Sequence, residues 1–296
     1  MMRHKPMLAY PVSAKPIDYT NKVFIQPKLD GVRCLIQANI KRHILSPDLN
    51  EIEVVAYSRT GKEWKNIDHI LEQLVLFFQE FPDVILDGEL YNHDLRDNFE
   101  KIISLVRKTK PTDEDRLEAS KKTQFHCYDV ILEREELDYD TRYNWLRCNL
   151  KTSDCVHSVE TRYIQSDVDA RIAHQINLNH GYEGSIVRLN YRYENKRSHN
   201  LRKFKDFHDA EATIIGFEEG KGKRKGTLGK FIMRDDNDVI FGCPPGKGYN
   251  YKDMKRLLQK AKWYVDHKAT ATFTYFERTK AGSYRHPLFK AIRDYE

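Results

Sequence analysis

A lysine beside a tight turn is the residue of this sequence with the strongest potential for covalent chemistry. Lys28 follows a short apolar run and precedes Asp30-Gly31, a pair that favours a tight turn because glycine adopts backbone angles that other residues avoid. Arg33 begins the next apolar run, within reach of a phosphate or ribose held near the amine. A lysine becomes a nucleophile when desolvation or neighbouring cations lower its pKa. An ordinary surface lysine in a hairpin turn would fit the segment Lys28–Arg33 equally well.

Carboxylates and cations recur in other short runs of strand-like sequence. Asp87 and Glu89 interrupt one apolar run, and Glu183 precedes another. A buried carboxylate is costly unless it is paired or binds a ligand, so these acids suggest a metal or a sugar contact. Lys203 and Lys205 are two residues apart, which places them on one face of a strand. With the basic turn Ser58–Lys62 and the aromatic, acidic segment Phe125–Val130, the set describes a Mg²⁺–polyphosphate site.

Short strands and amphipathic helices must position these residues within the first 207 residues. Strand-length apolar runs occur at 23–25, 34–36, 54–57, 84–86 and 185–187. Three- and four-residue spacing of apolar positions predicts helices over 66–80, near 99–106, and from Ser166 to Leu178. The charged segment 108–122 is either a solvated loop or an exposed helix, and the polar stretch 41–50 is expected to link the second and third strands.

The pattern changes after Phe207. Short strands at 212–217, 229–233, 239–241 and 271–276 are separated by turns rich in Gly, Asp and Asn, and one helix is expected over 252–262. Several short strands with one inserted helix favour a small barrel of the OB type. The chain is therefore predicted to be α+β, with a first domain over 1–207 and a small all-β OB-fold domain over 208–296.

The excess positive charge lies entirely in the second predicted domain. The 296 residues carry a net charge of +6, and residues 208–296 hold 18 Lys and Arg against 12 Asp and Glu. Residues 1–207 hold 32 Lys and Arg and 32 Asp and Glu, so they carry no net charge. A basic module beside a neutral one suggests a polyanionic partner. The candidate contacts lie in one glycine-rich stretch: Lys221, Lys223, Arg224 and Lys225.

Composition excludes several other classes of protein. No run approaches the ~18 consecutive apolar residues of a membrane span, and Met1–Val12 lacks a signal-peptide core. The five cysteines are scattered without a CxxC pair, as expected for reduced thiols in the cytoplasm. The 17 Tyr and 14 Phe argue against a disordered chain.

Six of these elements, taken in order, resemble the nucleotidyltransferase motifs of the ATP-dependent DNA ligases, which are related to RNA ligases and mRNA capping enzymes. Lys28–Arg33 matches the family element K-x-D-G-x-R, and Arg285–Asp294 resembles the last motif of the DNA ligases. Tyr295 stands where a lysine often follows in the longer form of that motif. The resemblance implies an antiparallel-sheet nucleotidyltransferase (adenylation) domain followed by the OB-fold domain, as in small ligases of bacteriophages and some bacteria.

The resemblance also implies roles for individual residues. Lys28 would accept AMP, Tyr128 would stack on adenine, and Gln26 would read its edge. Glu183 would hold a metal, and Glu89 would contact the ribose or a metal. The implied nucleotide contacts are Gln26, Arg33, Arg59, Glu89, Tyr128, Lys203, Lys205, Arg285 and Arg293, the last two touching the β- and γ-phosphates. The implied reaction uses ATP and Mg²⁺ to seal nicks in double-stranded DNA. The enzyme would act as a monomer in replication, repair or recombination, in the cytoplasm of a bacterial or phage-infected cell.

Two alternatives remain open from sequence. An RNA ligase or capping guanylyltransferase would use the same nucleophile, although the Arg-His-Pro-x-Phe element at 285–289 and the basic OB-like tail favour a DNA ligase. A non-catalytic OB-containing protein that binds nucleic acid would not need Lys28 together with two carboxylates and two same-face lysines.

Overall fold

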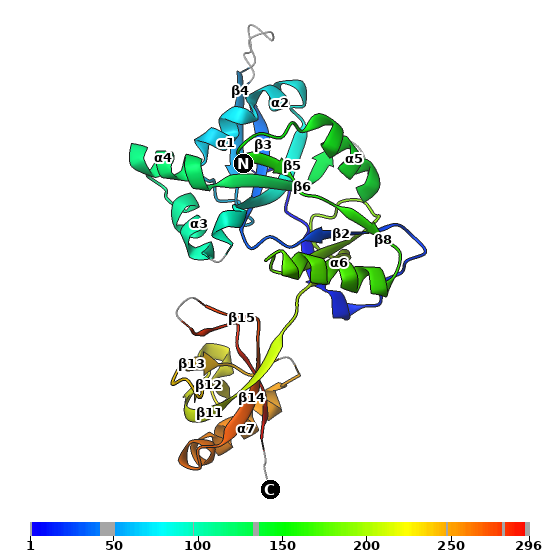
Figure 1. The fold of residues 1–296 in the computed structure, drawn as a ribbon. Coiled ribbons are helices and arrows are strands. Elements are labelled where there is room, and N and C mark those ends of the chain that lie inside the picture. Colours follow the sequence, from blue (N-terminus) through cyan, green and yellow to red (C-terminus); the bar gives the residue numbers. More distant parts are fainter. Residues whose placement is uncertain are drawn as a thin grey trace. The chain divides into compact units, whose positions relative to one another are not determined.

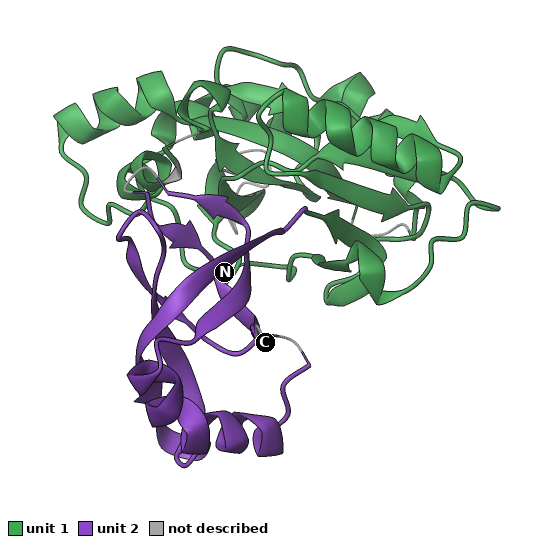
Figure 2. Cartoon of the chain, turned by 60° about the horizontal axis from the view of Figure 1, so that its bottom comes forward, with its two compact units in different colours: residues 1–205 green, residues 206–296 purple. Residues whose placement is uncertain are grey.

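The computed structural model describes residues 2–41, 51–96, 98–132, 136–246, 248–279 and 282–293. The predicted link over 42–50 lies outside these residues, as do Asp294 and Tyr295 of the last motif. The chain forms two compact units, residues 1–205 and 206–296 (Figure 2). Independent folding of each unit as a domain stays a prediction.

In the residues that the structure describes, the first unit forms two five-stranded sheets. The first sheet has the order β1 (Leu8–Pro11), β10 (Arg197–Phe204), β9 (Ser185–Leu189), β2 (Val23–Pro27), β8 (Arg162–Ile164). The second has the order β4 (Glu51–Tyr57), β3 (Val32–Lys41), β5 (Val84–Tyr91), β6 (Gln124–Leu132), β7 (Val156–Ser158). Most neighbours are antiparallel, as expected. The edge strands differ, because β1 runs parallel to β10 and β7 runs parallel to β6. A parallel pair of successive strands requires a crossover connection, and a helical segment provides it between β6 and β7.

Helices cover one face of each sheet (Figure 1). The helices of this unit are α1 (Asp68–Gln73), α2 (Val75–Glu80), α3 (Phe99–Val106), α4 (Asp113–Lys122), α5 (Tyr139–Asn149) and α6 (Asp167–Asn179), with short 3₁₀ turns η1 (Val12–Ala14) and η3 (His93–Leu95). The main core joins the second sheet to residues of α1, α2, α3 and α5. A smaller core joins α6 to Val23, Ile25 and Val187 of the first sheet. By strand alternation, Phe24, Gln26 and Lys28 lie on the opposite face.

One prediction about helices needs revision, and one open alternative is decided. The helix expected over 66–80 divides at Leu74, whose N–H bonds to the Leu71 carbonyl in a tighter turn. The segment 108–122 contains the exposed helix α4, which starts after Thr112 because Thr112 and Asp115 form a capping box. Helix α5 was not expected from the apolar spacing.

The second unit is an OB-type barrel, as predicted. Its sheet has the order β13 (Ile240–Cys243), β12 (Leu228–Arg234), β11 (His208–Glu219), β14 (Thr270–Tyr275), β17 (Leu288–Ile292). A bridge between Pro245 and Phe289 brings the chain after β13 to β17 and closes the barrel. Helix α7 (Tyr251–Asp266) connects β13 to β14, the 3₁₀ turn η4 (Gly222–Arg224) connects β11 to β12, and β15 (Glu277–Arg278) pairs with β16 (Tyr284–Arg285). Helix α7 is longer than the predicted 252–262.

No helix in the described part of the chain combines the length and the apolar character needed to span a membrane.

Candidate active site

Lys28 lies directly after β2 and is tied to the segment that precedes β9. Its N–H donates to the Gly184 carbonyl at 2.9 Å, and the Glu183 N–H donates to the Lys28 carbonyl at 3.2 Å. The turn that follows packs tightly on β5. A Cβ at Gly31 would lie 2.4 Å from the Leu90 carbonyl oxygen, so only glycine fits there. The Asp-Gly turn therefore holds the lysine between the two sheets.

The Glu183 carboxylate pairs with two lysines at once. Lys28 Nζ contacts Glu183 Oε2, and Lys205 Nζ contacts Glu183 Oε1. The carboxylate is almost fully buried, with 4% of its side chain exposed. Lys203 pairs in register with Ile186 of β9, and strand alternation places it on the same face as Lys205. The structure therefore brings together the nucleophile candidate, one acid and the two basic residues predicted from sequence.

Glu89 and Tyr128 approach this group from the second sheet. The Tyr128 hydroxyl donates to Glu89 Oε2 at 3.1 Å. Burial raises the pKa of Glu89 to about 7, although the cations of Arg33 and Lys28 act in the opposite direction. The charge of Lys28 thus acts on Glu89 as well as on Glu183.

Asp87 holds Arg33 in place. Arg33 Nε donates to Asp87 Oδ1 at 2.6 Å, and the Tyr193 hydroxyl donates to Asp87 Oδ2 at 2.7 Å. The guanidinium carbon of Arg33 lies 5.0 Å from the centre of the Tyr128 ring. The sequence left a ligand role open for either Asp87 or Glu89. In the structure, the Asp87 carboxylate is the ion-pair partner of Arg33.

Gln26 lies in a buried hydrogen-bond network rather than at a free edge. Its Nε2 donates to the Tyr139 hydroxyl at 2.9 Å and to Thr161 Oγ1 at 2.7 Å. Its Oε1 accepts from Arg188 Nε at 2.6 Å. Both ends of the amide already have protein partners, so reading of adenine by Gln26 stays a prediction that requires one of these bonds to be exchanged.

A buried charge cluster next to Gln26 was missed by sequence reasoning. Asp129 accepts from Arg142 Nε at 2.8 Å and from Arg188 Nη1 at 2.7 Å, and all three side chains are at most 5% exposed. The cluster joins β6, α5 and β9, and so fixes the strand that carries Tyr128 against the strand that follows Glu183. The available signal was Arg188, which directly follows the predicted strand 185–187. Strand alternation places it on the same face as Ile186 and opposite to Val187.

Arg59 lines a recess of about 730 Å³ that Arg33 and Glu89 also line. Arg33, Arg59 and Glu89 line this recess, together with Lys62 of the predicted basic turn and Lys108. The three residues come from β3, the turn after β4, and β5. Sequence predicted all three as nucleotide contacts, and the structure places them around one opening.

The remaining predicted residues belong to the second unit. Arg285 forms an ion pair with Glu277, and Arg293 Nε lies 2.6 Å from Glu211 Oε1. The exposed side chains of Lys221, Lys223, Arg224 and Lys225 lie in and beside η4. Phosphate contacts by these residues stay predictions.

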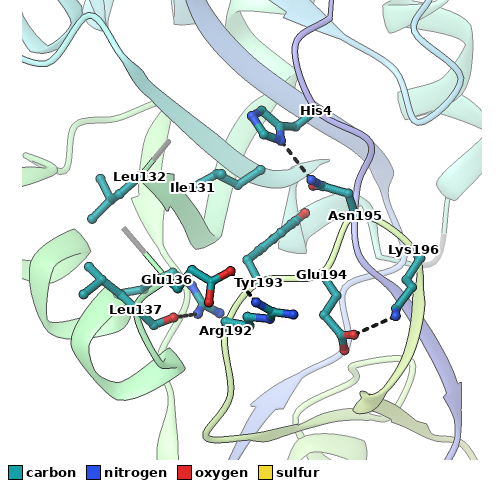
Figure 3. Close-up of a pocket in the computed structure, with 11 residues that line it drawn as sticks. His4, Ile131, Leu132, Glu136, Leu137, Arg192, Tyr193, Glu194, Asn195 and Lys196 are labelled. Atoms are coloured by element: carbon teal, nitrogen blue, oxygen red, sulfur yellow. Dashed lines mark hydrogen bonds and ion pairs between the residues drawn. The ribbon is translucent and has the colours of Figure 1, made fainter. Parts of the chain in front are cut away.

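Another cavity, of about 430 Å³, contains none of the predicted residues (Figure 3). Four of its charged side chains form two pairs: Arg192 pairs with Glu136, and Lys196 pairs with Glu194. Within the residues that the structure describes, no three His, Cys, Asp or Glu side chains gather closely enough to hold a metal ion alone. The chemistry therefore points to the group around Lys28.

Known proteins are similar to this chain in sequence. A DNA ligase of African swine fever virus (isolate Tick/South Africa/Pretoriuskop Pr4/1996) is 30% identical over 221 residues, which cover 70% of this chain and 49% of that protein. A DNA ligase of Enterobacteria phage T4 is 24% identical over 308 residues, which cover 88% of this chain and 61% of that protein. The chain thus spans about half to three-fifths of the length of these relatives.

Solved structures show the same fold. A Lig E DNA ligase superposes with a TM-score of 0.74 at 21% identity, covering 99% of this chain and 100% of that one. The ATP-dependent DNA ligase of bacteriophage T7, solved with ATP, gives a TM-score of 0.50 at 16% identity and covers 98% of each chain. Residues 6–205 match the family model of the ATP dependent DNA ligase domain. The chain therefore belongs to the ATP-dependent DNA ligase family.

Proposed function

We propose that the protein is an ATP-dependent DNA ligase that seals nicks in duplex DNA through an AMP adduct on Lys28. The observation that carries this proposal is the position of the Lys28 amine, paired with Glu183 and within the field of Glu89, with Lys205 on the same carboxylate. A lysine amine beside a second lysine, with two acids that can hold a metal ion, suits attack on a bound triphosphate. A protein that only binds nucleic acid has no need for this group.

In the first proposed step, Lys28 Nζ attacks the α-phosphorus of ATP. An N–P bond forms, the bond from phosphorus to the bridging oxygen breaks, and pyrophosphate leaves with the electron pair. The amine must first lose a proton. When Glu183 binds another cation, Lys28 loses the counterion that stabilises its charged form, while the cation of Lys205 stays nearby. The pKa of the Lys28 amine then falls, and its proton passes to solvent water before the attack.

Two further transfers complete the proposed reaction. The 5′-phosphate at a nick attacks the phosphorus of the adduct and releases Lys28, and the 3′-hydroxyl then attacks the activated 5′-phosphate and releases AMP. Such transfers depend on alignment and charge neutralisation. Lys203 and Lys205 would contact the α-phosphate, Arg33 and Arg59 the AMP or the nick phosphate, and Tyr128 the adenine. Arg285 and Arg293 would engage the pyrophosphate.

Glu89 and Glu183 fit a magnesium ion. Mg²⁺ is usually bound through one or two carboxylates together with substrate phosphates and water, and these two carboxylates flank Lys28 from opposite sheets. Bound there, the ion would neutralise charge on the phosphate oxygens. Because burial raises the pKa of Glu89 to about 7, its ligation of a cation would release a proton near neutral pH.

The second unit is the proposed DNA-holding module. Its basic loop, Lys221 to Lys225, would contact phosphates of the nicked duplex, and each contact adds a salt-dependent contribution to affinity. Action as a monomer, in the cytoplasm of a bacterial or phage-infected cell, completes the proposal.

One experiment tests the proposal against its alternatives. The protein is incubated with Mg²⁺ and ATP, GTP or NAD⁺ labelled in the phosphate that would be transferred, and the adduct is chased with nicked DNA or nicked RNA. Labelling by ATP followed by sealing of nicked DNA supports a DNA ligase. Sealing of nicked RNA alone would indicate an RNA ligase, and labelling by GTP would indicate a capping-type enzyme. The absence of any adduct would indicate a protein that only binds nucleic acid.

A further inference from the structure

Helix α7 carries an exposed basic face on the second unit. Its apolar residues Leu257, Leu258, Ala261, Tyr264 and Val265 pack against the barrel core. The opposite face is exposed and basic, and its cations are Lys252, Lys255, Arg256, Lys260 and Lys262. An amphipathic helix needs polar residues outside, but it does not need them to share one sign.

The acids of α7 do not neutralise this face. Asp253 accepts from the Asn250 N–H in a capping box, and Asp266 pairs with Lys262 at 3.1 Å. In the described part of the chain, no carboxylate pairs with Lys252, Lys255, Arg256 or Lys260. Four cations are left along ~12 Å of helix, a length over which duplex DNA presents about seven phosphates.

Tyr251 joins this face to the basic loop. Its hydroxyl donates to the Lys223 carbonyl at 2.9 Å and lies 3.3 Å from the Lys225 carbonyl. The loop is thereby held at the start of the helix, beside Lys252 and Lys255. The two basic segments, separated by about 30 residues in sequence, form one surface.

We propose that the outer face of α7 is a second phosphate-contacting surface for duplex DNA, continuous with the loop at 221–225, and that Tyr251 positions the loop against it. The inference rests on the proposed DNA ligase function. The charge of this face fits a polyanion, and its ~12 Å length matches a stretch of duplex backbone with about seven phosphates.

The test compares two variants that each lose four positive charges. In the first, Lys252, Lys255, Arg256 and Lys260 become Gln, which keeps good helix formers on α7. In the matched control, Lys22, Lys65, Arg192 and Lys196 of the first unit become Gln. Affinity for nicked duplex DNA is measured over a range of salt concentrations, and labelling by ATP without DNA is measured in parallel.

The α7 variant should bind more weakly by at least about tenfold at moderate salt, with a salt slope shallower by up to about 3–4. The control variant should keep most of the slope, and both should label normally with ATP. Single K255Q and R256Q variants, each expected to reduce the slope by about one, serve where the quadruple variant does not fold.

Tyr251→Phe tests the connection to the loop. It should weaken binding about two- to fivefold in the wild-type protein but have no further effect when the loop cations are already Ala, because Tyr251 acts through the loop. An unchanged slope in the α7 variant, or equal losses in the control, overturns the inference. Absence of both labelling and DNA binding in the wild-type protein instead overturns the proposed function.

Discussion

The side chains of Lys28 and Glu183 form an ion pair across 155 residues of sequence. The pairing follows from the first sheet, where Gln26 and Pro27 of β2 face Ile186 and Ser185 of β9. The hydrogen-bonded ladder therefore delivers the lysine and the acid to the same end of the sheet. Lys205, just after the neighbouring strand β10, reaches the other carboxylate oxygen.

Removal of the Glu183 charge should impair adduct formation. Glu183→Gln leaves two lysines without their shared counterion and removes a proposed metal ligand. We expect the rate of labelling by ATP to fall by about 100-fold or more, measured by single-turnover labelling. The control is Glu80→Gln, which neutralises an exposed carboxylate of α2. Equal rates in the two variants would contradict the role of Glu183.

The raised pKa of Glu89 predicts a pH-dependent contribution to stability. Its folded-state pKa of about 7 lies above the ordinary value of 4.5. The contribution is therefore fully present below pH ~4.5 and is lost as the pH rises through ~7. Glu89→Gln removes this dependence, so the free energy of unfolding of the variant should exceed that of the wild type by up to about 3 kcal/mol above pH 7.

Urea denaturation at several pH values measures that difference. The two proteins should converge toward pH 4.5, and a difference that stays constant with pH would show that Glu89 does not titrate in this range. The same variant should also show weaker dependence of adduct formation on Mg²⁺.

Gln26→Met tests whether Gln26 stabilises the folded site or recognises adenine. The substitution leaves Arg188 Nε without its acceptor and removes one hydrogen bond from the Tyr139 hydroxyl, so we expect the free energy of unfolding to fall by about 1–3 kcal/mol. The preference for ATP over GTP in the labelling reaction is measured alongside. Loss of that preference without loss of stability would show that Gln26 reads the base.

Replacement of Lys221, Lys223, Arg224 and Lys225 by Ala should weaken binding of nicked DNA and reduce its salt slope. Four lost phosphate contacts correspond to a change in slope of about 3–4. Labelling of Lys28 by ATP without DNA should persist, since the four loop cations are not among the proposed contacts to ATP. An unchanged salt slope would exclude these residues from the DNA contact.

Much of the site could be predicted because its residues lie next to the ends of strands. Lys28, Glu183 and Lys205 each lie at a recognisable strand boundary, and strand pairing then brings them together. The OB-type barrel was equally readable from short strands separated by turn residues. These features depend on local sequence and on the two-residue period of strands.

The buried network around Asp129 could not be predicted in the same way. Arg142 belongs to α5, which the apolar spacing did not reveal, and its partner is 13 residues earlier on another element. The pairing depends on how a helix packs on a sheet, which one sequence does not specify. The division of the 66–80 segment at Leu74 has a similar origin, because both halves keep apolar contacts with the second sheet.

The measurement that tests the central claim most directly is covalent labelling at Lys28. Wild-type protein, Lys28→Ala and the exposed control Lys15→Ala are incubated with Mg²⁺ and ATP labelled in the α-phosphate, and the adduct is located by peptide mass spectrometry. The account predicts one AMP on Lys28 in the wild type and in the control, and none in Lys28→Ala. A covalent label that persists in Lys28→Ala, or that maps to another residue of the wild type, would contradict it.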